Sequence, residues 1–194
     1  MTGALPSDIE RLDAALKDAE RDARAVAAGM SRSMGTWRAQ PGSWSVAECL
    51  DHLATGNRVY LAAMQPAAER ALRHGSTRRR PAEPGPIGRW FVRYLEPPVR
   101  AGLKSKAPRT IRPRPSPELD DALSAFLDSQ AAVRAFLCSY ANIDLAGVRF
   151  ANPFIRGVRF SLATGLHVLA AHERRHLWQA WRVRRAAEAA PAAV

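Results

Sequence analysis

The sequence predicts an all-α protein that folds as a four-helix bundle. Four long segments place apolar residues at alternating steps of three and four, the spacing that puts them on one face of a helix. Proline and glycine interrupt the chain between these segments, and no segment has the alternating pattern of a sheet. We therefore expect one domain over residues 1–194, with helices at about 7–31, 45–74, 117–141 and 160–188.

The first two helices each have a recognisable start. Ser7 or Asp8 is placed to cap the first helix, because their side chains can accept a hydrogen bond from a free backbone N–H. In the second helix, Ser45 and Glu48 match the capping box, in which each side chain bonds the backbone N–H of the other residue. The apolar face expected for the first helix is Ile9, Leu12, Leu16, Ala19, Ala23, Val26 and Met30.

The third and fourth helices have similar apolar faces. The third follows Pro117, and acidic residues close behind that proline favour the positively polarised end of a helix. Its apolar face comprises Leu119, Leu123, Phe126, Val133, Leu137 and Tyr140. The fourth helix places Leu162, Leu166, Leu169, His176, Ala180 and Val183 on one arc.

A long connection, residues 75–116, joins the second and third helices. It is rich in proline, glycine and arginine, and it is longer than the usual connection in a helical bundle. Residues 88–95 predict a short helix inside it. Residues 96–98 and 112–115 predict extended chain packed over the bundle.

The composition limits the classes of partner. The formal net charge of +11 at pH 7 raises the question of an anionic partner. Its arginines are spread over many segments, with the densest group at residues 78–80, and few aromatic residues accompany them to stack on bases. We therefore expect no nucleic-acid partner.

The sequence also predicts a cytoplasmic protein without a membrane partner. No run approaches the roughly 18 apolar residues of a membrane span, and the N-terminal segment lacks the pattern of a signal peptide. Cys49 and Cys138 both lie in predicted helices, where we expect them to be small buried apolar residues.

Two histidines of the fourth helix face the predicted core. His172 and His176 lie four residues apart on its apolar arc, so that their imidazoles stand one above the other and can bind the same metal ion. His167 faces nearly the opposite way, and we expect it at the surface.

His52 provides the third ligand of the predicted site, because it lies on the apolar face of the second helix. A single buried histidine is more often a hydrogen-bonded core residue than a ligand. However, burying three imidazoles without hydrogen-bond partners would cost several kcal/mol of folding free energy. One metal ion removes this cost because it binds all three. We therefore predict that His52, His172 and His176 bind one divalent metal ion.

Three nitrogen ligands leave a coordination position for water or substrate, as in catalytic metal sites. Gln179 lies one turn beyond His176, where it could hydrogen-bond a ligand or a bound substrate; a polar residue at the end of the bundle is the equally simple alternative. The residues do not select the metal, because imidazole binds zinc, nickel, copper and iron alike.

Two segments resemble motifs of the DinB-like superfamily, a group of bacterial four-helix proteins. Residues 44–53, with Trp44, Ser45 and His52, resemble the tryptophan–serine opening and the second-helix histidine of that family. Residues 172–179 resemble its fourth-helix pair of histidines with the glutamine that follows. Residues 152–154 and 106–108 are similar to weaker features of the family.

The resemblance implies an up-down-down-up bundle, often a homodimer, that holds zinc or nickel on His52, His172 and His176. It also implies a transfer or isomerisation reaction on a small electrophilic substrate, carried out with the help of a low-molecular-weight thiol such as bacillithiol, mycothiol or glutathione. Two alternatives remain open: a metal-dependent hydrolase that uses metal-bound hydroxide, and a non-enzymatic bundle that binds a metal or another ligand. The sequence assigns no catalytic side chain beyond the metal ligands.

The fourth helix also matches the zinc-peptidase motif, in which Glu173, between the two histidines, would act as general base. That enzyme class needs a third ligand downstream. After His176 the only acidic side chain is Glu188, and no histidine follows. The sequence therefore disfavours a peptidase, and we expect Glu173 at the surface or beside the ligands.

Overall fold

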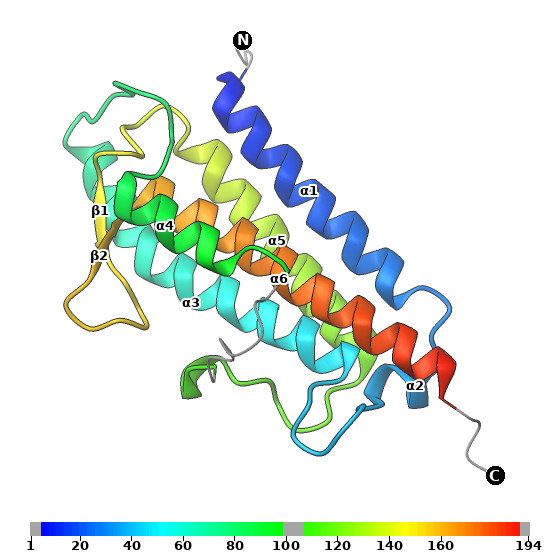
Figure 1. Cartoon of the computed structure of the whole chain (residues 1–194). Helices are drawn as coiled ribbons and strands as arrows, with labels where there is room; N and C mark the ends of the chain where they lie inside the picture. The colour runs from blue at the N-terminus through cyan, green and yellow to red at the C-terminus, as the bar shows by residue number, and fades with distance from the viewer. Residues whose placement is uncertain (1–4, 99–106, 191–194) are drawn as a thin grey trace.

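The computed structural model describes residues 5–98 and 107–190, and these are mostly helical. Four long helices form the bundle, namely α1 (Ser7–Ala27), α3 (Val46–Arg73), α5 (Leu119–Ser139) and α6 (Leu162–Ala189). Figure 1 shows that α1 and α6 run in one direction and α3 and α5 in the other. The predicted four-helix bundle is confirmed.

Five short elements complete the described part of the chain: α2 (Arg32–Thr36), α4 (Pro86–Leu95), the 3-10 helix η1 (Arg109–Ile111), β1 (Arg149–Ala151) and β2 (Arg159–Ser161). The two strands pair antiparallel, with Phe150 opposite Phe160, in the connection between α5 and α6. The sequence did not predict this sheet, because strands of three residues are too short to show an alternating pattern.

The first helix differs from its prediction at both ends. It ends at Ala27 rather than near residue 31, because Gly29 adopts a φ of +70°, a left-handed conformation that stops a right-handed helix. Its N-cap is Pro6, which makes no side-chain cap, so neither Ser7 nor Asp8 has the predicted capping role.

Asp8 instead ties α1 to the long connection. Its carboxylate accepts a hydrogen bond from the backbone N–H of Ala82 at 2.7 Å and forms an ion pair with Arg78. Burial is the largest single effect on the pKa of the Asp8 carboxyl and raises it. The hydrogen bonds and the charge of Arg78 together outweigh burial, so the pKa is lowered. The start of the connection is therefore held against the bundle.

The second long helix, α3, starts as the sequence predicts. The backbone N–H of Glu48 donates to Ser45 Oγ at 3.2 Å, and the backbone N–H of Ser45 donates to Glu48 Oε2 at 2.9 Å. Arg38 donates two further bonds to the Glu48 carboxylate, at 2.8 and 2.7 Å. Because both sides of the carboxylate are engaged, the first turn of α3 has a fixed position.

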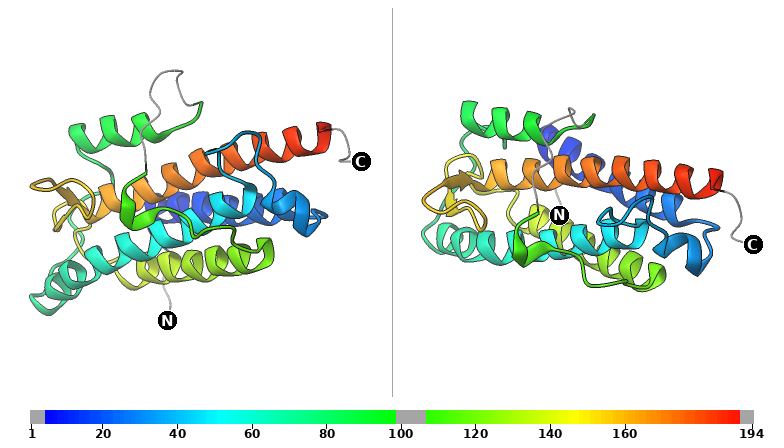
Figure 2. Two further views of the ribbon diagram at one scale, coloured as in Figure 1. Left: turned by 90° about the horizontal axis from the view of Figure 1, so that it is seen from below. Right: turned by 60° about the horizontal axis from the view of Figure 1, so that its bottom comes forward.

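The long connection covers two faces of the bundle. Its short helix α4 confirms the helix predicted at residues 88–95, and Figure 2 shows α4 lying outside the four long helices, next to α6. The segment around η1 crosses α3 on another side. Lys106, which belongs to one of the weaker family similarities, lies outside the described residues.

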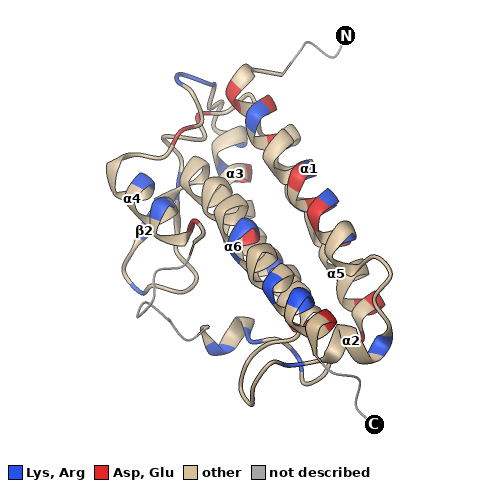
Figure 3. Ribbon diagram, turned by 45° about the vertical axis from the view of Figure 1, so that its right-hand side comes forward, with Lys and Arg blue, Asp and Glu red and all other residues tan. Residues whose placement is uncertain are grey.

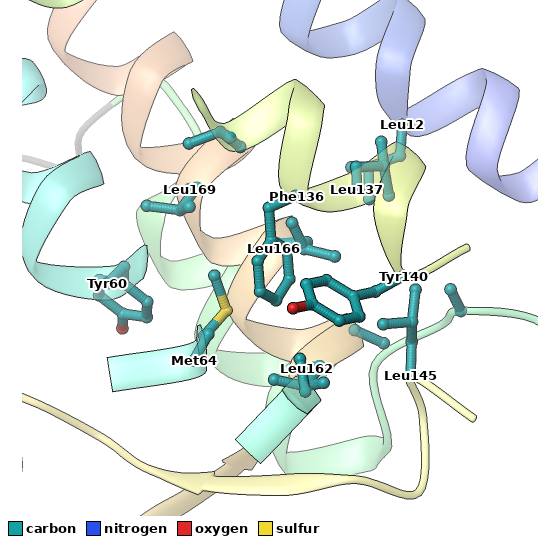
Figure 4. Close-up of a cluster of buried hydrophobic side chains, with 14 of the residues drawn as sticks. Leu12, Tyr60, Met64, Phe136, Leu137, Tyr140, Leu145, Leu162, Leu166 and Leu169 are labelled. Carbon is teal, nitrogen blue, oxygen red and sulfur yellow. The ribbon is translucent and has the colours of Figure 1, made fainter. Parts of the chain in front are cut away.

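The apolar core consists of two clusters, one toward each end of the bundle. The cluster nearer the strands includes Leu12 of α1, Met64 of α3, Leu137 of α5 and Leu166 of α6, whose side chains converge in Figure 4. The other cluster includes Val26, Leu50, Phe126, Leu177 and Val183 from the same four helices. Between these clusters, each of α3, α5 and α6 contributes polar side chains instead.

The two cysteines differ in their surroundings. Cys49 is buried, as predicted, and burial together with the neighbouring Glu48 raises the pKa of its thiol. Cys138 is exposed, so the expectation of a buried residue is wrong there. It follows the buried Leu137 in the last turn of α5, and the helical rotation of about 100° per residue turns it away from the core.

Charged residues are distributed over the surface rather than collected on one face. Figure 3 shows lysine and arginine on α1, α4 and α6, with aspartate and glutamate interspersed along α1. Many of these charges form ion pairs, such as those of Asp13 with Lys17 and Arg134. Within the described ranges, no helix is both long enough and apolar enough to cross a membrane.

Candidate metal centre

Three histidine side chains from two helices converge at the middle of the bundle. His52 comes from α3, and His172 and His176 come from successive turns of α6. Each offers one ring nitrogen, and these three nitrogens lie within 4.8 Å of one another. The cluster could therefore hold a metal ion, and it unites the three histidines that the helical periodicity singled out.

A backbone carbonyl fixes the orientation of His52. Its Nδ1 lies 2.6 Å from the carbonyl oxygen of Ile111. A carbonyl can only accept, so Nδ1 carries the proton and donates it, and Nε2 has a free lone pair. That lone pair is directed at the cluster, because Nε2 lies 3.0 Å from Nε2 of His172.

The carbonyl of Ile111 is held in turn by a buried carboxylate of α3. We call residues 109–114 the strap, because this segment crosses α3 beside the histidines. Asp51, which is only 1% exposed, accepts hydrogen bonds from the backbone N–H and from Nε of Arg114, both at 2.8 Å. The residue before His52 therefore anchors the segment that orients His52, a relationship the sequence did not reveal.

Gln179 orients His176 in a comparable way. Its Oε1 lies 3.0 Å from Nδ1 of His176, which donates the proton and leaves Nε2 without one. Trp44 packs beside the cluster, with its ring 4.6 Å from that of His52 and 5.5 Å from that of His176 between centroids. The sequence left open whether Gln179 bonds a ligand or is only a polar residue at the end of the bundle. In the structure its side chain bonds to His176.

His172 fits against the backbone of α3 because Gly56 has no side chain. A Cβ atom at position 56 would lie 3.3 Å from Cε1 of His172, closer than ordinary van der Waals contact. Glycine costs helix stability relative to alanine, so its place in the middle of α3 is explained by the imidazole beside it.

The surroundings keep all three imidazoles neutral near pH 7. Burial is the largest cause in each case and lowers the pKa of His52, opposed by its bond to Ile111. The pKa values of His172 and His176 lie well below the ordinary value, because the other imidazoles and the positive charge of Arg175 add to the effect of burial. Neutral imidazole is the form that binds a metal ion.

The geometry of these nitrogens fits a metal ion of the first transition series. Two nitrogens 3.0 Å apart, each at an M–N bond length of about 2.05 Å, subtend an angle of about 95° at the ion. Ligands of one ion can lie at most about 4.2 Å apart, so the widest pair needs to close by less than about 1 Å. His172 and His176 are only half buried, so an ion held by the three histidines would be accessible to solvent.

Glu173 has a different place from the one predicted. It is fully buried, and its two carboxylate oxygens accept hydrogen bonds from Asn57 at 3.0 Å and from Gln130 at 2.9 Å. Burial raises the pKa of its carboxyl to about 7, against the effect of these bonds. Because both oxygens are held by amides of α3 and α5, Glu173 is not placed to act as general base beside the histidines.

These amides belong to a buried polar layer, which we define as Asn57, Ser129, Gln130 and Glu173. Asn57 also donates to Ser129 at 3.2 Å, and Gln130 donates to the backbone carbonyl of Leu16 on α1 at 2.8 Å. The layer thus connects all four long helices at the level of the histidines. Among the described residues, Oδ1 of Asn57 is buried without a hydrogen-bond partner.

The sequence predicted that His167 lies at the surface, and the structure differs from this prediction. It is half buried, and its Nε2 lies 3.0 Å from the carbonyl oxygen of Ala82 and 3.8 Å from Glu83 Oε2. The prediction failed because the long connection covers this side of α6. His167 does not join the other three histidines.

The comparisons with known proteins give one finding. A family model described as the DinB superfamily matches residues 15–180, a range that includes His52, His172 and His176. No curated protein and no solved structure matches the chain.

Proposed function

The chain belongs to the DinB superfamily, and from this membership and its three-histidine cluster we propose that it is a metal-dependent enzyme that transfers a low-molecular-weight thiol to a small electrophile. In this proposal His52, His172 and His176 hold one divalent ion, zinc or nickel. The single observation that carries it is the anchoring of His52 and His176 through Nδ1, which leaves the Nε2 atoms as ligands.

An ion held by these histidines would supply Lewis acidity, lowering the pKa of a thiol or water near it so that a nucleophile forms near neutral pH. The protein provides the ligands of the ion. Its three imidazoles are neutral and would not compensate the charge of the ion, which would favour an anionic sulfur. In the transfer, the sulfur would bond to the electrophilic carbon, the leaving group would depart with the bonding electrons, and the thiol proton would pass to solvent.

The surroundings of the cluster support a small-molecule substrate. Trp44 gives the site one apolar aromatic wall beside His52 and His176. The half-buried positions of His172 and His176 allow access from solvent without exposing the whole cluster. An electrophile of modest size can thus meet the sulfur against Trp44, where partial exclusion of water favours the attack.

The proposal is tested by assaying protein loaded with zinc or nickel against an aryl halide and a nitrophenyl ester, each with and without a small thiol. The matched variants are His176→Ala, which removes one ligand, and His74→Ala, which removes an exposed histidine at the end of α3. We expect metal-dependent loss of the aryl halide only with thiol present. Activity should be retained in His74→Ala and lost in His176→Ala.

Other outcomes contradict the proposal in distinct ways. Ester cleavage that needs metal and the three histidines but no thiol would instead indicate a hydrolase. Full metal binding without turnover across a broad panel of thiols and electrophiles would indicate a non-enzymatic bundle. Turnover that persists in His176→Ala would place the reaction elsewhere in the molecule.

A further inference from the structure

Arg175 is a half-buried arginine without a carboxylate partner among the described residues. It lies on α6 between two proposed ligands, three residues after His172 and one before His176. The other half-buried arginines of the described chain each form an ion pair: Arg78 with Asp8, Arg134 with Asp13, Arg174 with Glu96 and Arg184 with Glu188. An unpaired, partly desolvated guanidinium is costly unless an anion joins it.

The contacts of Arg175 leave most of its hydrogen-bonding capacity unused. Its one hydrogen bond in the described structure runs from Nη1 to the carbonyl oxygen of Tyr94, at 3.4 Å. A guanidinium has five N–H donors in a planar fork suited to a carboxylate. The neighbouring Arg174 shows the contrast, because it also reaches the end of α4 but finds Glu96 there, with one bond at 3.0 Å.

No acidic side chain in the undescribed internal segment could fill this role. Residues 99–106 include Arg100, Lys104 and Lys106 but neither aspartate nor glutamate. The missing negative charge is therefore one that a ligand can supply.

Arg175 is close enough to the histidines for a single small molecule to contact both. Residues three apart on a helix have Cβ atoms about 5–6 Å apart, and the long arginine side chain extends that reach. A small molecule that carries both a metal-binding atom and an anionic group can therefore contact the histidines and Arg175 together.

We propose that Arg175 forms an anion subsite beside the three histidines, which selects a thiol or substrate that carries a carboxylate close to its metal-binding atom. This inference rests on the proposed function, because it requires an ion on His52, His172 and His176. It adds the chemical class of the ligand: a small acid rather than a neutral or cationic compound. Arg175 contributes a charge-assisted, two-pronged hydrogen bond to that group.

The test uses protein loaded with cobalt(II), whose visible spectrum reports both metal binding and the arrival of a sulfur ligand. Mercaptoacetate and 2-mercaptoethanol serve as matched probes, because both offer a thiol and only the first has a carboxylate. The variants are Arg175→Gln and Arg175→Lys, with Arg182→Gln as the control. Arg182 lies two turns along α6, is exposed and stacks on Trp178.

We expect the ratio of the two dissociation constants, mercaptoethanol over mercaptoacetate, to fall by about tenfold or more in Arg175→Gln and to stay unchanged in Arg182→Gln. Arg175→Lys should lie between them, since it keeps the charge but not the fork. Because the ratio is taken within one protein, a variant that merely binds cobalt less well does not change it.

Equal ratios in wild type, Arg175→Gln and Arg175→Lys would overturn the inference while leaving the metal site intact, since cobalt and thiol would still bind. Failure of the proposed function has a different signature. In that case wild-type protein would show no cobalt spectrum that depends on His176, and neither thiol would alter it.

Discussion

The Nδ1 atom of His52 lies 2.6 Å from the carbonyl oxygen of Ile111, so that the long connection between α3 and α5 sets the orientation of a residue in the core. The two residues are 59 positions apart in the chain. A segment that resembles a surface loop in sequence is thus part of the candidate metal centre. The properties of the site should therefore respond to changes that loosen this segment.

Asp51→Ala should weaken metal binding without touching a ligand. The substitution removes the carboxylate that holds the strap at Arg114, so the carbonyl of Ile111 loses its fixed position and His52 its orientation. We expect metal affinity to fall by about 10–100-fold, the usual effect of removing a group that orients a ligand. Competition with a chromogenic chelator measures this.

The control for that substitution is Asp18→Ala, which removes an exposed ion pair with Arg21 on α1. It should leave metal affinity unchanged, since a surface pair contributes little. Equal affinities for wild type and Asp51→Ala would mean that the strap does not orient His52.

Gln179→Leu should weaken metal binding through His176. Leucine has a similar size but cannot accept the proton from Nδ1 of His176, so the imidazole loses its fixed orientation and tautomer. We expect a loss of affinity of about tenfold, and Gln179→Glu should retain affinity because it keeps an acceptor. If Gln179→Glu loses as much affinity as Gln179→Leu, the hydrogen bond is not the reason.

Gly56→Ala should change stability and metal binding in opposite directions. Alanine favours the helix by up to about 1 kcal/mol, so the melting temperature of the metal-free protein should stay level or rise. The new Cβ would lie 3.3 Å from Cε1 of His172 and displace its imidazole, so metal affinity should fall. Thermal unfolding and metal titration of the same sample check both. A fall in stability with unchanged affinity would contradict the role given to Gly56.

Glu173→Gln should remove one pH dependence of stability. Burial raises the pKa of Glu173 from 4.5 to about 7, so the protonated acid is favoured in the folded protein. The stabilisation from this group is therefore complete below about pH 4.5 and is lost as the pH rises to about 7. The linkage relation puts the loss on the order of 3 kcal/mol, and glutamine, which does not ionise, should not show it.

Urea unfolding of the two metal-free proteins between pH 4.5 and 8 measures this effect. The difference between them isolates Glu173, because the histidines, whose lowered pKa values cost stability as the pH falls below about 6.5, are common to both. The stability of wild type relative to Glu173→Gln should fall as the pH rises. A constant difference across the range would show that Glu173 is ionised in the folded protein throughout.

Much of the fold and the three histidines could be predicted from local patterns. Helical periodicity placed His172 and His176 on one inward face, and it placed His52 on the apolar face of α3. The capping box at Ser45 and Glu48 gave the start of α3, because both partners lie within one turn. Structural features that depend only on residues within one helix can be predicted from the sequence in this way.

The features that were missed depend on contacts between distant segments. Glu173 looked like an edge residue because the prediction gave α6 one apolar face, whereas α1, α3 and α4 all pack on α6 and Gln130 of α5 bonds to Glu173. Its partners Asn57 and Gln130 are ordinary polar residues until the bundle brings them together. The role of Asp51 likewise depends on where the strap crosses α3, which no local pattern indicates.

The central claim is that His52, His172 and His176 hold one divalent ion, and the metal content of protein purified without an affinity tag tests it most directly. Wild type and His74→Ala should contain close to one equivalent of zinc or nickel, and His52→Ala and His176→Ala should contain almost none. Wild-type protein that contains no metal and takes up none when zinc or nickel is added would contradict the claim, and the histidines would then be only a hydrogen-bonded part of the buried core.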